Sequence, residues 1–208
     1  MDWMTAAGHH RGEGFACLAN MMRRPGVWDA MAEAFLGARG DLGDRLFSAL
    51  VAAESAGGDL RGGESAALLV VEPESTDNPL ADRVFDLRVE DHERPLDELR
   101  RLMRLQRAYW HSTRADALLT EERFEEALAE YAQAEKWAPD ELQLVFWRAV
   151  ALVNAGRSDD ALPLFQRVFD EDPHWILMIR RLPRVGLLPE DEQIMKRVLA
   201  AADAASSS

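Results

Sequence analysis

Residues 115–139 read ADALLTEERFEEALAEYAQAEKWAP, and residues 149–173 read AVALVNAGRSDDALPLFQRVFDEDP. The second segment repeats the first at an offset of 34 positions (149 − 115). The matching pairs are Ala115 and Ala149, Ala127 and Ala161, Tyr131 and Phe165, Ala134 and Val168, and Pro139 and Pro173. Alanine lets two antiparallel helices cross closely, the aromatic side chain fills the space between repeats, and proline ends the second helix. The stretch therefore predicts two consecutive helix pairs.

A period of 34 residues with this pattern is typical of tetratricopeptide repeats, in which the first helix of each pair lines a concave face. By that register the predicted lining and binding residues are Tyr109, Gln143, Phe146, Val150 and Asn154. A tetratricopeptide clamp that grips a terminal carboxylate needs lysines on this face. None is present here, and the second half of the face is apolar.

The chain itself can fill the apolar half of this face. A short apolar helix is predicted at residues 175–182, stopping at Pro183, and its Ile176, Leu177, Ile179 and Leu182 are suited to cap the repeats. A last amphipathic helix is expected between residues 189 and 201. Two repeats are fewer than the three or so that a free-standing solenoid needs, so a cap is expected on physical grounds.

The first half of the chain has shorter elements. Hydrophobic periodicity predicts strands at residues 15–22, 65–71 and 83–90, and helices at residues 27–36 and 42–56. Residues 1–14 are polar and glycine-rich, and no strand is predicted there, so the strand at 15–22 lacks an evident partner. We therefore predict an α+β part at residues 1–93 and an all-α part at residues 94–208, with the repeats at about residues 108–173.

Composition excludes several function classes. The net charge of −13 disfavours a nucleic-acid surface, which needs clustered positive charge, and equally disfavours an anionic membrane face. Cys17 is the only cysteine, so no disulfide framework or cysteine-rich metal cluster is expected. No stretch has signal-peptide character or approaches the roughly 20 apolar residues of a membrane span. A cytoplasmic protein without cofactor or metal is the expectation.

Several segments of the first half resemble an uncharacterised family, the domain of unknown function 1028. They are residues 7–22 (AGHHRGEGFACLANMM), 57–71 (GGDLRGGESAALLVV), 86–92 (DLRVEDH) and 95–102 (PLDELRRL). The resemblance extends over about residues 6–105 and implies an N-terminal-nucleophile hydrolase fold, a four-layer αββα sandwich. In these terms the first half of this chain is an incomplete αββα sandwich and corresponds to the C-terminal portion of the family.

The sequence departs from that family in three places. Leu18-Ala19-Asn20 stands where the family has glutamine-glycine-asparagine, and Glu64 stands where it has glutamine. The part of the family that carries the nucleophile has no counterpart here, and Met1-Asp2 offers no serine, threonine or cysteine. The resemblance therefore implies a fold of catalytic type without the group that attacks.

Candidate chemistry gathers in the glycine loop. Asp59, Arg61 and Ser65 are the candidate catalytic residues, because glycines bring the backbone close to a ligand and Arg61 can hold a carboxylate with two hydrogen bonds. The competing interpretation is an Arg–Asp pair that orders the loop, and we favour it. His9, His10 and Glu13 are disfavoured as a metal site, since no further ligand lies at a suitable spacing.

Two further side-chain types have structural interpretations. Cys17 lies within an apolar strand and is interpreted as a small hydrophobic residue, because no histidine is placed to activate it. Arg100, Arg104 and Arg107 form a stripe along one helix face, and they are expected to pair with Asp97, Glu98 and other internal carboxylates.

The hypothesis that follows is a non-catalytic protein for protein interaction or oligomerisation, a homo-oligomer or a binder of another protein. One alternative is the C-terminal portion of an N-terminal-nucleophile amide hydrolase. Another is a peptide-binding repeat adaptor, which requires the concave face around Phe146 and Val150 to be open.

Overall fold

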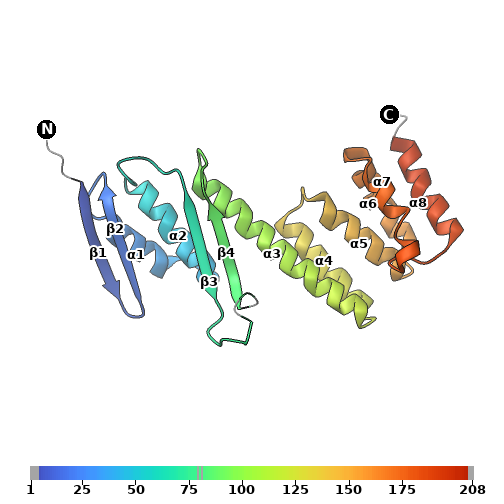
Figure 1. Cartoon of the computed structure of the whole chain (residues 1–208), viewed down its shortest axis with the longest axis horizontal. Helices are drawn as coiled ribbons and strands as arrows, with labels where there is room; N and C mark the ends of the chain where they lie inside the picture. The colour runs from blue at the N-terminus through green and yellow to red at the C-terminus, as the bar shows by residue number, and fades with distance from the viewer. Residues whose placement is uncertain (1–4, 79, 81, 206–208) are drawn as a thin grey trace. The chain divides into compact units, whose positions relative to one another are not determined.

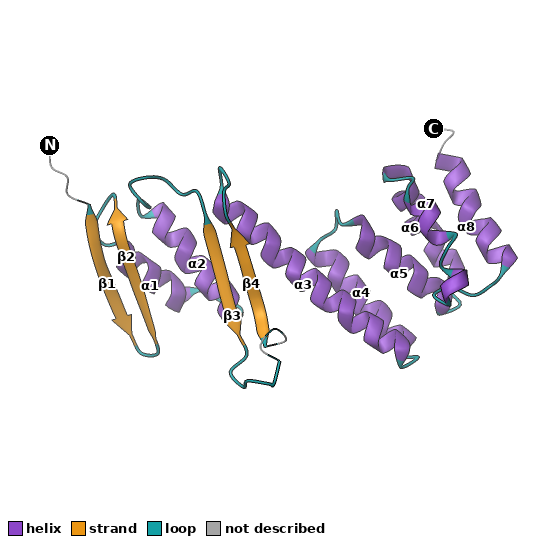
Figure 2. Cartoon of the chain, viewed as in Figure 1, coloured by secondary structure: helices purple, strands orange, loops and turns teal. Residues whose placement is uncertain are grey.

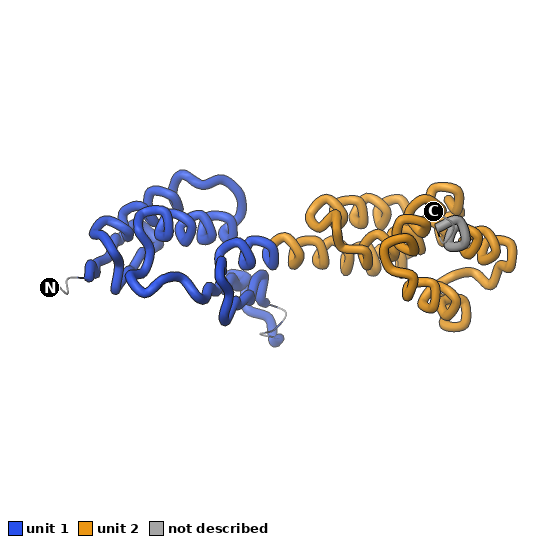
Figure 3. The backbone as a smooth tube through the Cα atoms, turned by 90° about the horizontal axis from the view of Figure 1, so that it is seen from above, with its two compact units in different colours: residues 1–103 blue, residues 104–208 orange. Residues whose placement is uncertain are grey.

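A computed structural model of the chain describes residues 5–78, 80 and 82–205. The chain divides into two compact units, unit 1 up to Met103 and unit 2 from Arg104 (Figure 3). The predicted fold class is confirmed, because paired antiparallel strands with helices form the N-terminal part and helices alone form the rest (Figure 2). No helix in the described ranges combines the length and the apolar character that crossing a bilayer requires.

Unit 1 contains two antiparallel hairpins. The first is β1 (Ala6–Gly12) with β2 (Phe15–Met22), and the second is β3 (Ala66–Val71) with β4 (Arg83–Val89). Between the hairpins along the chain lie α1 (Val27–Gly37) and α2 (Leu42–Ser55), and both lie behind the strands in Figure 1. The three predicted strands and two predicted helices are therefore present in the predicted order.

The prediction that residues 1–14 contain no strand was wrong, because β1 occupies Ala6–Gly12 and pairs with β2 in the register His10↔Cys17. The glycines that lower the strand propensity of this segment have a packing role. A Cβ added at Gly8 would lie 2.5 Å from the Trp28 ring, and one at Gly12 would lie 2.1 Å from the Phe15 ring. Glycine lets these two rings pack directly on the backbone of β1.

The helices of unit 1 have clear start and packing signals. Asp41 caps α2, accepting from the Asp44 N–H at 2.9 Å while the Asp44 carboxylate accepts from the Asp41 N–H. The inner faces of β3 and β4 pack on Phe47 of α2 and on the first turns of α3 (Pro95–Thr120). The core residues shared by these elements are Phe47, Leu68, Val70, Phe85, Val89, Leu99 and Met103. Leu99 and Met103 belong to this core, and unit 1 extends to Met103.

Unit 2 is built from the remainder of α3 and the helices that follow it. These are α4 (Phe124–Trp137), α5 (Leu142–Asn154), α6 (Ser158–Glu171), α7 (Trp175–Ile179), a short 3₁₀ helix (Pro183–Val185) and α8 (Glu192–Ala205). The small side chains of the 34-residue repeat all lie in the interior. Ala115, Ala127, Ala149 and Ala161 each have 0% exposure, which is what close helix crossing at these positions requires.

Tyr131 carries a polar group into this core. Its side chain is 1% exposed, and its hydroxyl donates a hydrogen bond to Oδ1 of Asp116 on α3. Burial, together with the neighbouring Asp116 carboxylate, raises the pKa of the Tyr131 phenol. The neutral hydroxyl therefore joins α3 to α4 across the working range of pH.

We expect Tyr131→Phe to lower the free energy of unfolding of unit 2 by about 1–2 kcal/mol, since it removes a hydrogen bond to a carboxylate without emptying the ring's site. Denaturant unfolding followed by tryptophan fluorescence measures the change. Tyr109→Phe is the matched control, because Tyr109 makes only an exposed bond of 3.3 Å to Gln143. Equal losses in the two variants would contradict a special contribution from Tyr131.

Candidate functional site

The glycine loop between α2 and β3 is held in place by β2. Gly57 and Gly58 adopt positive φ angles of 134° and 61°, which side chains disfavour. The Leu60 N–H donates to the Met21 carbonyl at 2.8 Å, and the Arg23 N–H donates to the Gly58 carbonyl at 3.1 Å. The loop thereby borders a pocket of about 510 Å³, and this pocket is also where Asp59, Arg61 and Ser65 meet.

Asp59 and Arg61 are bonded to each other. Arg61 Nε and a terminal guanidinium nitrogen donate to the two Asp59 carboxylate oxygens at 2.9 and 2.8 Å, and the Arg61 N–H donates to Oδ1 at 2.8 Å. These hydrogen bonds lower the pKa of Asp59 to about 2. The pair matches the interpretation in which it orders the loop, and the fork of Arg61 is already occupied by an internal carboxylate.

Ser65 is exposed and lacks an activating group. None of the hydrogen bonds within the described residues involves its hydroxyl, and the other acidic side chains lining the pocket are Glu54 and Glu64. His92 is the histidine closest to Ser65 in the sequence, and its backbone N–H donates to the Glu64 carbonyl at 3.0 Å. A nucleophile needs a base within hydrogen-bond reach, and this pocket does not present one to Ser65.

The other candidates of unit 1 lie apart from that pocket. His10 Nδ1 lies 2.9 Å from Asp29 Oδ1, and its ring stacks on Phe15 at 6.1 Å between centroids. No group of three or more potential metal ligands occurs among the described residues. Cys17 is buried, and burial raises the pKa of its thiol, which makes it a poor nucleophile.

The predicted concave face of the repeats is closed over its second half. Phe146 is 0% exposed and Val150 is 3% exposed. The Trp175 ring of α7 lies 4.6 Å from the Phe146 ring between centroids, and Ile179 and Leu182 belong to the same core. A concave face open at Phe146 and Val150 is therefore not what the structure shows, because the chain's own C-terminal segment packs there.

The remaining predicted binding residues take part in internal bonds. The Tyr109 hydroxyl donates to Gln143 Oε1 at 3.3 Å, and Asn154 Nδ2 donates to the Leu187 carbonyl at 3.1 Å. Burial, followed by the nearby Glu141 carboxylate, raises the pKa of Tyr109. Tyr109 and Gln143 thus bond α3 to α5, whereas Asn154 bonds α5 to the C-terminal segment.

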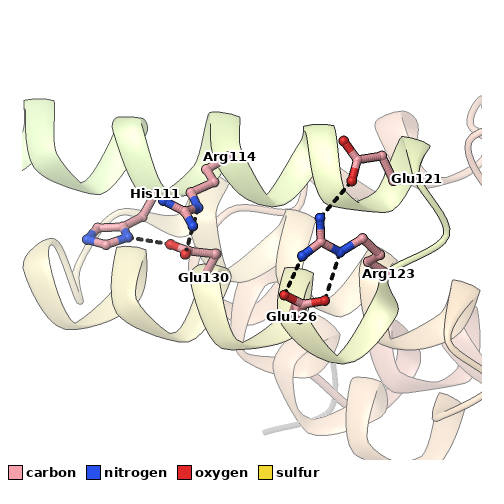
Figure 4. Close-up of polar contacts among 6 residues, drawn as sticks. All are labelled: His111, Arg114, Glu121, Arg123, Glu126 and Glu130. Carbon is pink, nitrogen blue, oxygen red and sulfur yellow. Dashed lines mark hydrogen bonds and ion pairs between the residues drawn. The ribbon is translucent and has the colours of Figure 1, made fainter.

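Polar clusters between α3 and α4 were not predicted from the sequence. Glu130 of α4 lies 2.6 Å from His111 and 3.0 Å from Arg114, and both of these residues are on α3 (Figure 4). In the same view Arg123, at the turn between the helices, contacts both Glu121 and Glu126. Each of these groups has a hydrogen-bond or ion-pair partner inside its cluster, so the clusters fix the helix pair rather than present a free ligand group. The i,i+3 spacing of Arg123 and Glu126 is a signal in the sequence, whereas the contacts of Glu130 depend on the register between the two helices.

The arginine stripe has partners that the sequence did not suggest. Arg100 lies over the Phe47 ring at 5.1 Å, Arg104 donates to the Trp137 carbonyl at 3.1 Å, and Arg107 lies over the Trp137 ring at 4.9 Å. The arginine that pairs with Glu98 is Arg101, at 2.7–2.8 Å. The expected pairing with carboxylates did not include these contacts with aromatic rings and a helix-end carbonyl.

The outer face of the hairpins in unit 1 exposes apolar side chains. Side chains alternate along a strand, so the residues opposite the buried face point away from α1 and α2. On β2 this places Leu18 in solvent at 73% exposure, and on β3 it places Leu69 and Val71 at 56% and 55%. Exposed apolar side chains gathered on neighbouring strands are typical of interaction surfaces.

Replacing Arg61 by Gln is expected to raise the pKa of Asp59 from about 2 toward its ordinary range. Asp59 has a depressed pKa in the folded chain, so its stabilising contribution is present above the ordinary carboxyl range and is lost as the pH falls through about 2. A carboxyl-carbon NMR titration of both proteins measures this. An Asp59 titration that Arg61→Gln leaves unchanged would contradict the assigned pair.

Comparisons with known proteins agree with the two units. Neither a curated protein nor a solved structure gives a significant match. Residues 2–99 match the model of a family of unknown function, DUF1028, and residues 112–174 match the model of the tetratricopeptide repeat. The N-terminal part of the chain is thus similar to DUF1028, and the part that follows is similar to tetratricopeptide repeats, which generally mediate protein–protein interaction.

Proposed function

We propose that the chain is a non-catalytic protein-interaction protein of the cytoplasm, and that it associates with further copies of itself through the outer strand face of unit 1. The observation that carries this proposal is the exposure of Leu18, Leu69 and Val71 on a face that no helix of unit 1 covers. Burial of apolar surface is the main driving force for protein association. The match of residues 112–174 to an interaction repeat supports the same class of function.

Electrostatics are compatible with contact at this face. β2 and β3 carry no charged residue, whereas the outer strand β4 carries Arg83, Asp86 and Arg88. Asp86 is bonded to both arginines, so the rim carries ion pairs with one positive charge in excess. An apolar centre with a polar rim is the usual anatomy of a protein interface.

The amide-hydrolase alternative depends on the resemblance of the first half to a hydrolase-type family. The residues that would have to act are Asp59 and Arg61, which bond each other, and Ser65, which lacks a base. These contacts support the non-catalytic proposal. An assay of the purified chain against a panel of acyl amides and aminoacyl anilides tests it, and turnover that Ser65→Ala abolishes would overturn it.

Self-association is tested by light scattering across a range of chain concentrations. We expect Val71→Lys to weaken association by at least about tenfold, because each interface would then bury unpaired ammonium groups. Leu177→Lys in unit 2 is the matched control, since Leu177 is 57% exposed and Val71 is 55% exposed. A monomer at all concentrations, or equal weakening in both variants, would contradict the proposed interface.

A further inference from the structure

A groove of about 390 Å³ lies between the two hairpins of unit 1. Residues 15–17 of β2 form one wall, and residues 67–69 of β3 form the other. Met31 and Phe35 of α1 and Leu46 and Leu50 of α2 line it as well. In Figure 1, β2 and β3 are the neighbouring strands of the two hairpins, with the helices behind them. The groove is therefore a trough with strand walls and a helical floor.

Both walls are strand edges that lack a strand partner on the groove side over most of their length. Within the described residues β2 pairs as a strand only with β1, and β3 only with β4. On this edge β2 is engaged near its end, where Met22 bridges Asp59 and the Met21 carbonyl accepts from Leu60, so residues 15–20 are the part that lacks a partner. An unpaired edge presents a row of N–H and C=O groups, which is the template for adding a strand.

The lining of the groove restricts the chemistry of its occupant. None of the lining residues is charged, although the whole chain has a net charge of −13. Cys17 and Leu68 face the interior side of the walls, with exposures of 6% and 4%. An occupant with charged side chains along its length would leave those charges without partners on the floor. The lining thus favours an uncharged segment with apolar residues at alternate positions.

The shape of the groove argues against a whole folded copy as its occupant. Every strand edge that a second copy can offer belongs to a hairpin that is packed on its own helices. The groove is enclosed by strands on two sides and by helices beneath, so such a layered body does not reach the inner edges. A single extended segment or a bare hairpin has the thickness of one sheet layer and can lie between them.

We infer that this groove binds an uncharged, extended segment of another polypeptide, which hydrogen-bonds through its main chain to β2 or β3 and places alternate apolar side chains on α1 and α2. Such strand addition gives affinity through the backbone and selectivity through the side-chain floor. The inference rests on the proposed interaction function and assigns it a second surface, separate from the outer face at Val71.

The probe is a synthetic peptide of residues 65–71 (SAALLVV), carrying a fluorescent label and a polyethylene-glycol tail for solubility. This sequence is uncharged and already forms a strand in the chain. The control peptide has the same side chains but N-methyl groups at every residue after the first, which removes the main-chain donors along both edges. We expect fluorescence anisotropy to report binding of the first peptide only, with slowed hydrogen exchange at residues 15–20 and 67–70.

Leu69→Arg and Val71→Arg form a matched pair of variants. The two residues lie on the same face of β3 with nearly equal exposure, 56% and 55%, but only Leu69 lines the groove. We expect Leu69→Arg to weaken peptide binding by at least about tenfold, and Val71→Arg by less than about threefold, because only Leu69 lines the groove, where its substitute would lie beside the bound peptide. Unchanged circular dichroism in both variants confirms that the fold is retained.

Three results would overturn the inference. They are equal binding of both peptides, absence of binding up to about 1 mM, and equal effects of the two variants. Groove amides that become protected with rising chain concentration in the absence of peptide would assign the groove to a second copy and would also overturn it. If the peptide fails while Val71→Lys still weakens self-association, the groove inference is wrong and the proposed function stands. Turnover abolished by Ser65→Ala would instead remove the proposed function, whatever the peptide does.

Discussion

Close approach of helices at alanine is the constraint on which unit 2 depends. Ala115, Ala127, Ala149 and Ala161 have no exposed surface, and larger side chains at these positions would force the helix pairs apart. Once the helices are close, Phe146 and Phe165 fill the space between the pairs, with ring centroids 5.9 Å apart. The same closeness brings polar groups together, so that Tyr131 contacts Asp116 and Arg148 contacts Glu135 between neighbouring helices. Packing therefore sets the polar contacts, and these in turn fix one arrangement of the helices.

Much of this fold follows from local sequence patterns, and the failures have identifiable causes. The 34-residue repeat and the strand at residues 66–71 are predictable because each has a strong period and clear ends. β1 was missed because Gly8 and Gly12 lower strand propensity, and their use, as seats for the Trp28 and Phe15 rings, is visible only in three dimensions. The pairing of Glu130 with His111 was missed for a similar reason, since the two residues lie on different helices and are 19 positions apart in the chain.

Two candidate catalytic residues of the glycine loop, Asp59 and Arg61, bond to each other. An aspartate, an arginine and a serine in a glycine loop resemble a ligand site, yet Arg61 bonds Asp59 through both side chain and backbone. A group that is satisfied within its own loop has little left to offer a substrate. By contrast, the unsatisfied features of unit 1 are apolar side chains and strand edges, and these favour contact with another chain over chemistry on a small molecule.

The contact between Trp175 and Phe146 also bears on how such an array can change length. Adding the repeat period to Leu142, where α5 begins, gives position 176 (142 + 34), and α7 lies at Trp175–Ile179. The C-terminal segment thus stands at the place in the chain where the first helix of a third repeat would start. A tandem duplication inserted after Glu171 would have to displace Trp175 and Ile179 from the core before a new pair could stack. The short apolar helix therefore acts as a terminator of the array, and growth by repeat duplication is compatible only with insertions ahead of α6.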